Sequence, residues 1–284
     1  FPLIAQILAT FLGISSSLAL ELLILLICFC IITTSAYLGI TKGIKRLSNI
    51  NIGLLTLLLL FILIAGPSAY IVLNSIDVLI TYGQRFIQMS TYIGDQFVQD
   101  WTVFYWAWWL ALAPYLGVFF VNISNGKSIR QLILGTIFIG GFGSVIHFLI
   151  LGNYSLHLFE TNVMDLPAMY LEEKPTKVIV DVILSLPLSY LILFLYGLIS
   201  VIFLCTTYDS CAYILSRTAM NRSDISPSKI LRIVFSVILV IQPAILMYLG
   251  GVNTVKWMLV ISAIPLIFIN ILLIGYILRN VQKI

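Results

Sequence analysis

Aromatic residues crowd the stretch from Asp100 to Phe120, which holds four of the five tryptophans in the chain. If this stretch is helical, one stripe roughly 100° wide collects most of its large side chains, namely Trp101, Tyr105, Trp108, Trp109, Leu112 and Leu116. A quaternary ammonium has no proton to donate, and each ring face it contacts stabilises it by about 0.5 to 2 kcal/mol. The stripe therefore predicts a surface that binds such a cation.

Packing is the alternative interpretation of this stripe, because rings at helical spacing also fill cores and form belts at membrane interfaces. Belt tryptophans lie at the ends of spans, whereas Trp108 and Trp109 lie two turns inside a helix that begins near Asp100. This depth favours a ligand site. Pro114 removes a backbone donor in mid-span and predicts a bend, which a membrane helix tolerates where protein or a cavity takes up the freed carbonyl.

A second polar feature, the run from Phe203 to Ser210, interrupts another apolar span. The hydroxyls of Thr206 and Thr207 either donate back to a carbonyl one turn earlier or supply oxygen ligands to a hard cation. Asp209 is a candidate cation or proton site because carboxylates are costly inside a membrane. Its closeness to basic residues instead favours a place near the cytoplasmic boundary, with hydrogen bonds to neighbouring backbone.

Groups suited to catalysis or metal binding are sparse. His147 lies alone in an apolar helix, His157 lies in a polar loop, and Ser210 has no histidine on its own helix to act as a base. The cysteines lie in or beside apolar spans without metal-like spacing and are interpreted as packing residues: Cys28, Cys30, Cys205 and Cys211. We expect no enzyme activity and no organic cofactor.

The composition excludes a soluble domain, because 61% of the 284 residues are hydrophobic, 9% are charged and the mean hydropathy is +1.11. It predicts an all-α polytopic membrane protein with the lipid bilayer as its surroundings and one transmembrane domain over residues 1–284. The net charge of +4 is spread over several loops, so no nucleic-acid partner is expected. Phe1 opens inside an apolar run without a methionine, which predicts that the N-terminal part is missing.

Seven complete spans and the end of an eighth are predicted. They cover residues 1–12, 21–40, 52–73, 100–120, 131–151, 187–215, 230–249 and 257–278. Gly66-Pro67 predicts a bend within the third, and glycines in the fifth suit close helix contact. A surface helix is expected over 74–100 and a partly helical outer loop over 152–181.

The basic residues sort by loop and predict the orientation. Most of them fall in four loops or ends that we assign to the cytoplasm, namely Lys42, Lys45, Arg46, Lys127, Arg130, Arg217, Arg222, Lys229, Arg232, Arg279 and Lys283. The intervening loops hold only Arg85, Lys174, Lys177 and Lys256. This distribution predicts a protein of the inner cell membrane with a cytoplasmic C-terminus.

The string Trp101-Thr-Val-Phe-Tyr-Trp-Ala-Trp-Trp109, followed by Ile123-Ser-Asn-Gly-Lys-Ser-Ile-Arg130, resembles the signature of the betaine/carnitine/choline transporter family. The resemblance extends along the whole chain and includes the run from Gly43 to Asn51. It implies the LeuT-type fold with a five-plus-five inverted repeat, of which this chain is the later part, with about four and a half N-terminal helices missing.

The resemblance also implies a function and its residues. Family members are secondary active transporters that take up trimethylammonium compatible solutes of the glycine betaine, choline or carnitine type, most by sodium symport. The substrate-binding positions would be Trp101, Tyr105, Trp108, Trp109 and Leu112. One wall of a sodium site would be Phe203, Thr206 and Thr207.

Several alternatives stay open at this point. Sodium-independent exchange and proton symport occur in the same family, and some relatives form homotrimers. A passive channel and an intramembrane enzyme are the other function classes. Flux that only follows its own gradient would support the channel.

Overall fold

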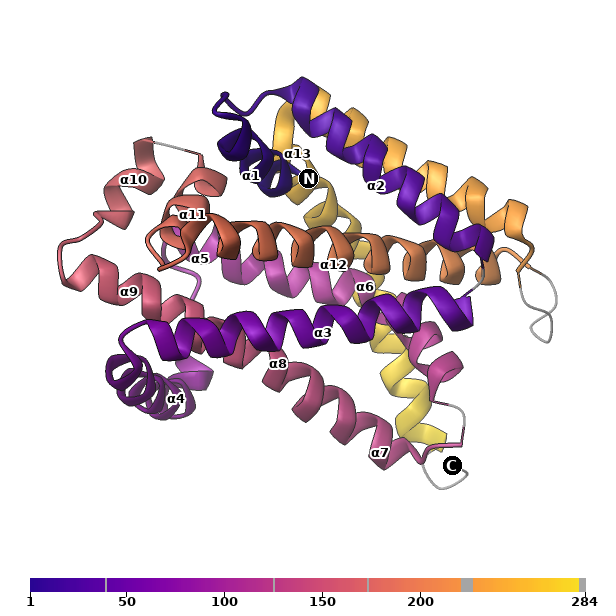
Figure 1. Cartoon of the computed structure of the whole chain (residues 1–284). Helices are drawn as coiled ribbons and strands as arrows, with labels where there is room; N and C mark the ends of the chain where they lie inside the picture. The colour runs from indigo at the N-terminus through magenta and orange to yellow at the C-terminus, as the bar shows by residue number, and fades with distance from the viewer. Residues whose placement is uncertain (39, 125, 173, 221–226, 281–284) are drawn as a thin grey trace. The chain divides into compact units, whose positions relative to one another are not determined.

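The computed structural model describes residues 1–38, 40–124, 126–172, 174–220 and 227–280, and it contains no strand in these ranges. The expected all-α class is therefore confirmed for the described part of the chain. The longer helices are α1 (Pro2–Leu12), α2 (Leu18–Leu38), α3 (Ile40–Ala65), α4 (Ser68–Thr91), α6 (Phe104–Ile123), α12 (Ser189–Thr218) and α13 (Lys229–Asn280) (Figure 1). Gly13 closes α1 in the left-handed conformation with φ 65°.

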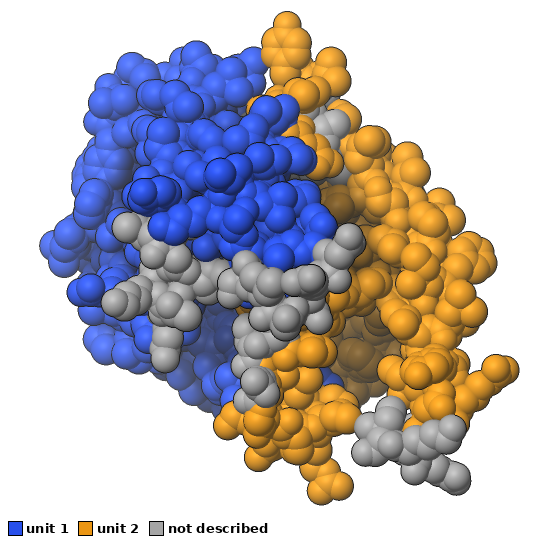
Figure 2. All heavy atoms as spheres, turned by 90° about the vertical axis from the view of Figure 1, so that its right-hand side faces the viewer, with its two compact units in different colours: residues 1–80, 135–241 blue, residues 81–134, 242–284 orange. Residues whose placement is uncertain are grey.

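The chain divides into two compact units, each assembled from two separate stretches of sequence (Figure 2). Unit 1 contains residues 1–80 and 135–241, and unit 2 contains residues 81–134 and 242–284. The aromatic stretch belongs to unit 2, whereas the polar run from Phe203 to Ser210 belongs to unit 1. A single transmembrane domain remains a prediction.

Unit 1 is built around α12, which runs between α2 and α3 (Figure 1). One buried cluster joins α12 to α3 and to α11 (Pro175–Leu184) through residues such as Leu58, Ile62, Ile183 and Leu193. A second cluster joins α1, α2 and α12 and contains the buried Cys28 and Cys205. The interpretation of these two cysteines as packing residues is confirmed.

Five helical stretches are long and apolar enough to cross a membrane, by length and composition, within the described residues. They are Arg46–Ala65, Gln96–Val121, Ile129–Glu160, Ser189–Thr218 and Lys256–Asn280. Shorter apolar helices cover Pro2–Leu12 and Leu18–Thr34. The multi-pass architecture expected from the composition is confirmed.

The span predicted over 52–73 is wrong at its outer end, because α3 stops at Ala65 and α4 starts at Ser68. Pro67 has no amide hydrogen, and it disfavours a helical conformation at Gly66 before it. Gly66-Pro67 therefore ends the helix, whereas only a bend was predicted there. The Gly66 amide still donates to the Ile62 carbonyl at 2.9 Å. The Ser68 hydroxyl donates to the Leu63 carbonyl at 2.6 Å.

Two further expectations need correction. The loop predicted between residues 249 and 257 is helical, because α13 is continuous over 52 residues. The glycine-rich span alternates α-helix with two π-helical stretches, η2 (Gly135–Gly140) and η3 (Phe148–Gly152). Within unit 1, a Cβ atom added to Gly140 or Gly143 would meet no other atom within 4 Å. These glycines therefore make no close helix contact there.

Pro114 lies inside α6 without ending the helix. Because proline has no amide hydrogen, the Leu110 carbonyl one turn earlier loses its partner within the helix. The side-chain amide of Asn270, on α13 in the same unit, donates to that carbonyl at 2.9 Å. Protein thus takes up the freed carbonyl, as expected from the sequence.

Replacing Asn270 with leucine in the full-length protein should cost about 1 kcal/mol of unfolding free energy, because the Leu110 carbonyl loses its donor. The same substitution in a Pro114→Ala background should cost less, since an alanine in place of the proline restores a backbone donor. Unfolding in detergent followed by circular dichroism measures both. Equal costs in the two backgrounds would contradict this role of Asn270.

Candidate functional site

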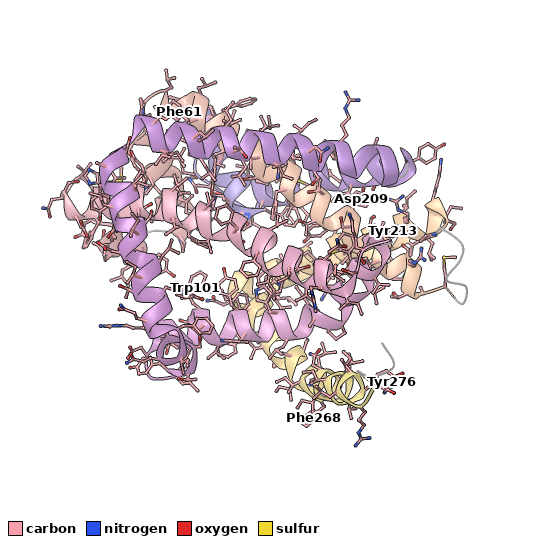
Figure 3. All side chains as sticks on the ribbon, turned by 90° about the horizontal axis from the view of Figure 1, so that it is seen from below. Phe61, Trp101, Asp209, Tyr213, Phe268 and Tyr276 are labelled. Carbon is pink, nitrogen blue, oxygen red and sulfur yellow. The ribbon has the colours of Figure 1, made fainter. Side chains whose placement is uncertain are left out.

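Three rings of the predicted stripe stack into a column that spans the residues just before α6 and its first turns. The ring centroids of Trp101 and Tyr105 are 6.1 Å apart with planes inclined by 26°, and those of Tyr105 and Trp108 are 6.1 Å apart with planes inclined by 17°. Trp101 lies in the π-helical stretch η1 (Gln99–Val103), which leads directly into α6. Its position is labelled in Figure 3. The spacing of four and three residues brings these rings onto one face.

The remaining predicted residues lie outside this aromatic column. Trp109 is 61% exposed and makes no ring contact with the residues that the structure describes, and Leu112 is half-buried. Phe104, which the sequence analysis missed, is buried and meets Trp108 edge-on at 5.3 Å. Its spacing of four residues from Trp108 is the signal that could have revealed it.

A lysine contacts the aromatic column from α13. The Lys256 ammonium nitrogen lies 4.1 Å from the centroid of the Trp101 ring and 5.3 Å from that of Phe104. All three residues belong to unit 2. A cation at this distance over an indole is stabilised by the ring quadrupole. The column therefore already holds one ammonium group of the protein itself.

The predicted sodium residues share one face of α12 in unit 1. The Thr206 hydroxyl donates to the carbonyls of Ile202 and Phe203, both at 3.0 Å, and the Thr207 hydroxyl donates to the Phe203 carbonyl at 2.9 Å. Both hydroxyls thus donate to a carbonyl one turn earlier on the same helix, a bond that we call a back-bond. This was the alternative interpretation to cation binding. Each oxygen still has lone pairs that can face a cation.

Asp209 has a partner that the sequence analysis did not foresee. Its Oδ1 accepts a hydrogen bond from Nη2 of Arg232 at 2.7 Å, and the two side chains are 1% and 4% exposed. The guanidinium carbon of Arg232 also lies 5.9 Å from the ring centroid of Tyr213, one turn after Asp209 on α12. Asp209 and Tyr213 are labelled in Figure 3. This buried ion pair joins α12 to the start of α13, so we interpret it as structural.

Unit 1 also contains a cavity of about 480 Å³ between α3, the glycine-rich span and α12. Its lining combines rings, hydroxyls and an amide: Asn51, Leu55, Gly140, Gly143, Ser144, His147, Phe148, Tyr196, Ile199, Ser200 and Phe203. The Oδ1 atom of Asn51 is buried without a hydrogen-bond partner among the described residues. The cavity thus borders the predicted sodium wall at Phe203.

The long apolar helices are those of a polytopic membrane protein, and they carry an aromatic column and a row of hydroxyls. The sequence model of the "BCCT, betaine/carnitine/choline family transporter" matches residues 1–283. The chain belongs to this family. This confirms the expected family, whose members are named as transporters and not as enzymes.

Curated relatives agree with this assignment. The chain is 26% identical to the glycine betaine transporter OpuD of Bacillus subtilis over 277 residues, which are 95% of this chain and 53% of the relative. It is 29% identical to an ectoine/hydroxyectoine transporter of Virgibacillus pantothenticus over 253 residues, 88% of this chain and 50% of the relative. It is 28% identical to a carnitine transporter of Acinetobacter baumannii over 271 residues, which are 93% of this chain and 49% of the relative. The chain thus spans about half the length of these relatives.

Proposed function

We propose that the full-length protein is a secondary active transporter that takes up a trimethylammonium compatible solute of the glycine betaine, carnitine or choline type across the cell membrane. The observation that carries this proposal is the aromatic column of Trp101, Tyr105 and Trp108, with Trp109 and Leu112 on the same helix. Stacked rings bind a cation that lacks protons without the cost of leaving hydrogen-bond donors unpaired.

Sodium symport is the proposed coupling. The Phe203 carbonyl and the hydroxyls of Thr206 and Thr207 present oxygen atoms on one face of α12, and oxygen is the ligand that hard cations prefer. One inward charge gains about 2.3 kcal/mol per 100 mV, which corresponds to nearly fiftyfold accumulation. An inward sodium gradient would therefore drive uptake of the solute.

Solute uptake into proteoliposomes containing the full-length protein tests the proposal. With an imposed inward sodium gradient, glycine betaine, carnitine or choline should accumulate, and replacing sodium by potassium at fixed pH and potential should abolish accumulation. Full uptake without sodium would favour exchange or proton symport. No uptake of any of these solutes would overturn the proposed substrate class.

The double substitution Thr206→Ala with Thr207→Ala should raise the sodium concentration for half-maximal uptake at least about tenfold, or roughly 1.4 kcal/mol. The matched control is Thr218→Ala, because the Thr218 hydroxyl makes the same kind of back-bond, to Leu215 at 2.9 Å, near the end of the same helix. We expect Thr218→Ala to leave the sodium dependence unchanged. If the double variant has the same sodium dependence as this control, the Thr206 and Thr207 hydroxyls stabilise the helix and do not bind sodium.

A further inference from the structure

Lys256 stands out as a charged group in contact with the aromatic column. It is half-buried, and its ammonium lies closer to the Trp101 ring than to that of Phe104, at 4.1 Å against 5.3 Å. Across the described residues, no carboxylate lies within 4.0 Å of this ammonium. The acidic residues nearest the column in sequence are engaged elsewhere: Asp95 accepts from the Tyr92 hydroxyl at 3.3 Å and Asp100 accepts from Gln96 at 3.2 Å.

The column still has ring surface available beyond Lys256. Tyr105 is 45% exposed and Trp108 is 37% exposed, whereas Lys256 covers the Trp101 end. A trimethylammonium group that lies against Tyr105 or Trp108 would therefore have a fixed positive charge nearby. That charge repels a second cation and attracts an anionic group carried by the same solute.

Resting on the proposed function, we propose that Lys256 is a specificity-determining residue that selects zwitterionic trimethylammonium solutes over purely cationic ones. The trimethylammonium group contacts the rings of Tyr105 and Trp108, and the solute carboxylate pairs with the Lys256 ammonium. Choline carries a hydroxyl in place of the carboxylate, so it meets only the repulsion. Glycine betaine and carnitine carry the carboxylate that completes the pair.

Simple competition would leave a different signature. If Lys256 only covered Trp101, its removal would strengthen the binding of all trimethylammonium compounds alike. If it selects zwitterions, its removal weakens glycine betaine and strengthens choline. The ratio of the two affinities thus separates selection from competition, because any general effect on folding or on the rings cancels in that ratio.

The test measures glycine betaine and choline binding to the full-length protein by isothermal titration calorimetry at fixed sodium. Lys256→Gln and Lys256→Met should lower the preference for glycine betaine over choline about tenfold, whereas Lys256→Arg should largely keep it. The matched control is Lys229→Gln, since the Lys229 ammonium lies 4.2 Å from the Tyr37 ring centroid in unit 1, outside the unit that holds the column. This control should keep the wild-type ratio.

Unchanged affinities for both solutes in both neutral variants, with the wild type binding both solutes, would overturn the role of Lys256 and leave the proposed function intact. Equal gains for both solutes would identify Lys256 as a competitor only and would also overturn selection. A wild type that binds neither solute would instead refute the proposed substrate class.

Discussion

Replacing Trp108 with alanine in the full-length protein is expected to weaken trimethylammonium solute binding about thirtyfold. Trp108 ends the aromatic column, stacked on Tyr105 and supported edge-on by the buried Phe104. A desolvated ring face contributes about 2 kcal/mol to cation binding, and its removal sets the size of the loss. Titration of glycine betaine into purified protein, followed by calorimetry, gives the dissociation constants.

Two further variants make this result specific. Trp108→Phe keeps a smaller ring and should retain part of the affinity. Trp106→Ala removes another exposed indole from the same helix, but Trp106 points away from the predicted stripe and should leave binding unchanged. If Trp108→Ala binds as tightly as Trp106→Ala, the column is a packing element and the site assignment is wrong.

The substitution Asp209→Asn is expected to lower the unfolding free energy of the full-length protein by about 3 to 5 kcal/mol. It removes the negative charge that pairs with Arg232 and leaves the buried guanidinium without a carboxylate partner. Both partners are almost completely withdrawn from solvent, so screening by water cannot replace the lost charge. Chemical unfolding in detergent, followed by circular dichroism, measures the change.

The double variant Asp209→Leu with Arg232→Met should cost less than Asp209→Asn alone, because it removes both charges and fills the space with apolar groups. Asp77→Asn on the exposed face of α4 is the control and should change stability by less than about 0.5 kcal/mol. A loss for Asp209→Asn no larger than that of this control would show that the ion pair does not hold α12 against α13.

The sequence by itself determined the class of the protein and the kind of chemistry to look for. Apolar runs of span length can only be helices in lipid, because every backbone donor and acceptor must be paired within the segment. The stripe of Trp101, Tyr105 and Trp108 was predictable because helical periodicity fixes which residues share a face. The back-bonds of Thr206 and Thr207 also follow from local geometry alone.

Other features were decided by tertiary structure, because their partners lie far apart in the sequence. Arg232 meets Asp209 across 23 positions, and Asn270 reaches the Leu110 carbonyl across 160. Lys256 lies over the Trp101 ring. Helical periodicity could not predict this contact, because it does not say which helices face each other. The sequence sets the amphipathic pattern of each helix, whereas the pairing of buried charges, freed carbonyls and ring faces depends on how separate helices pack together.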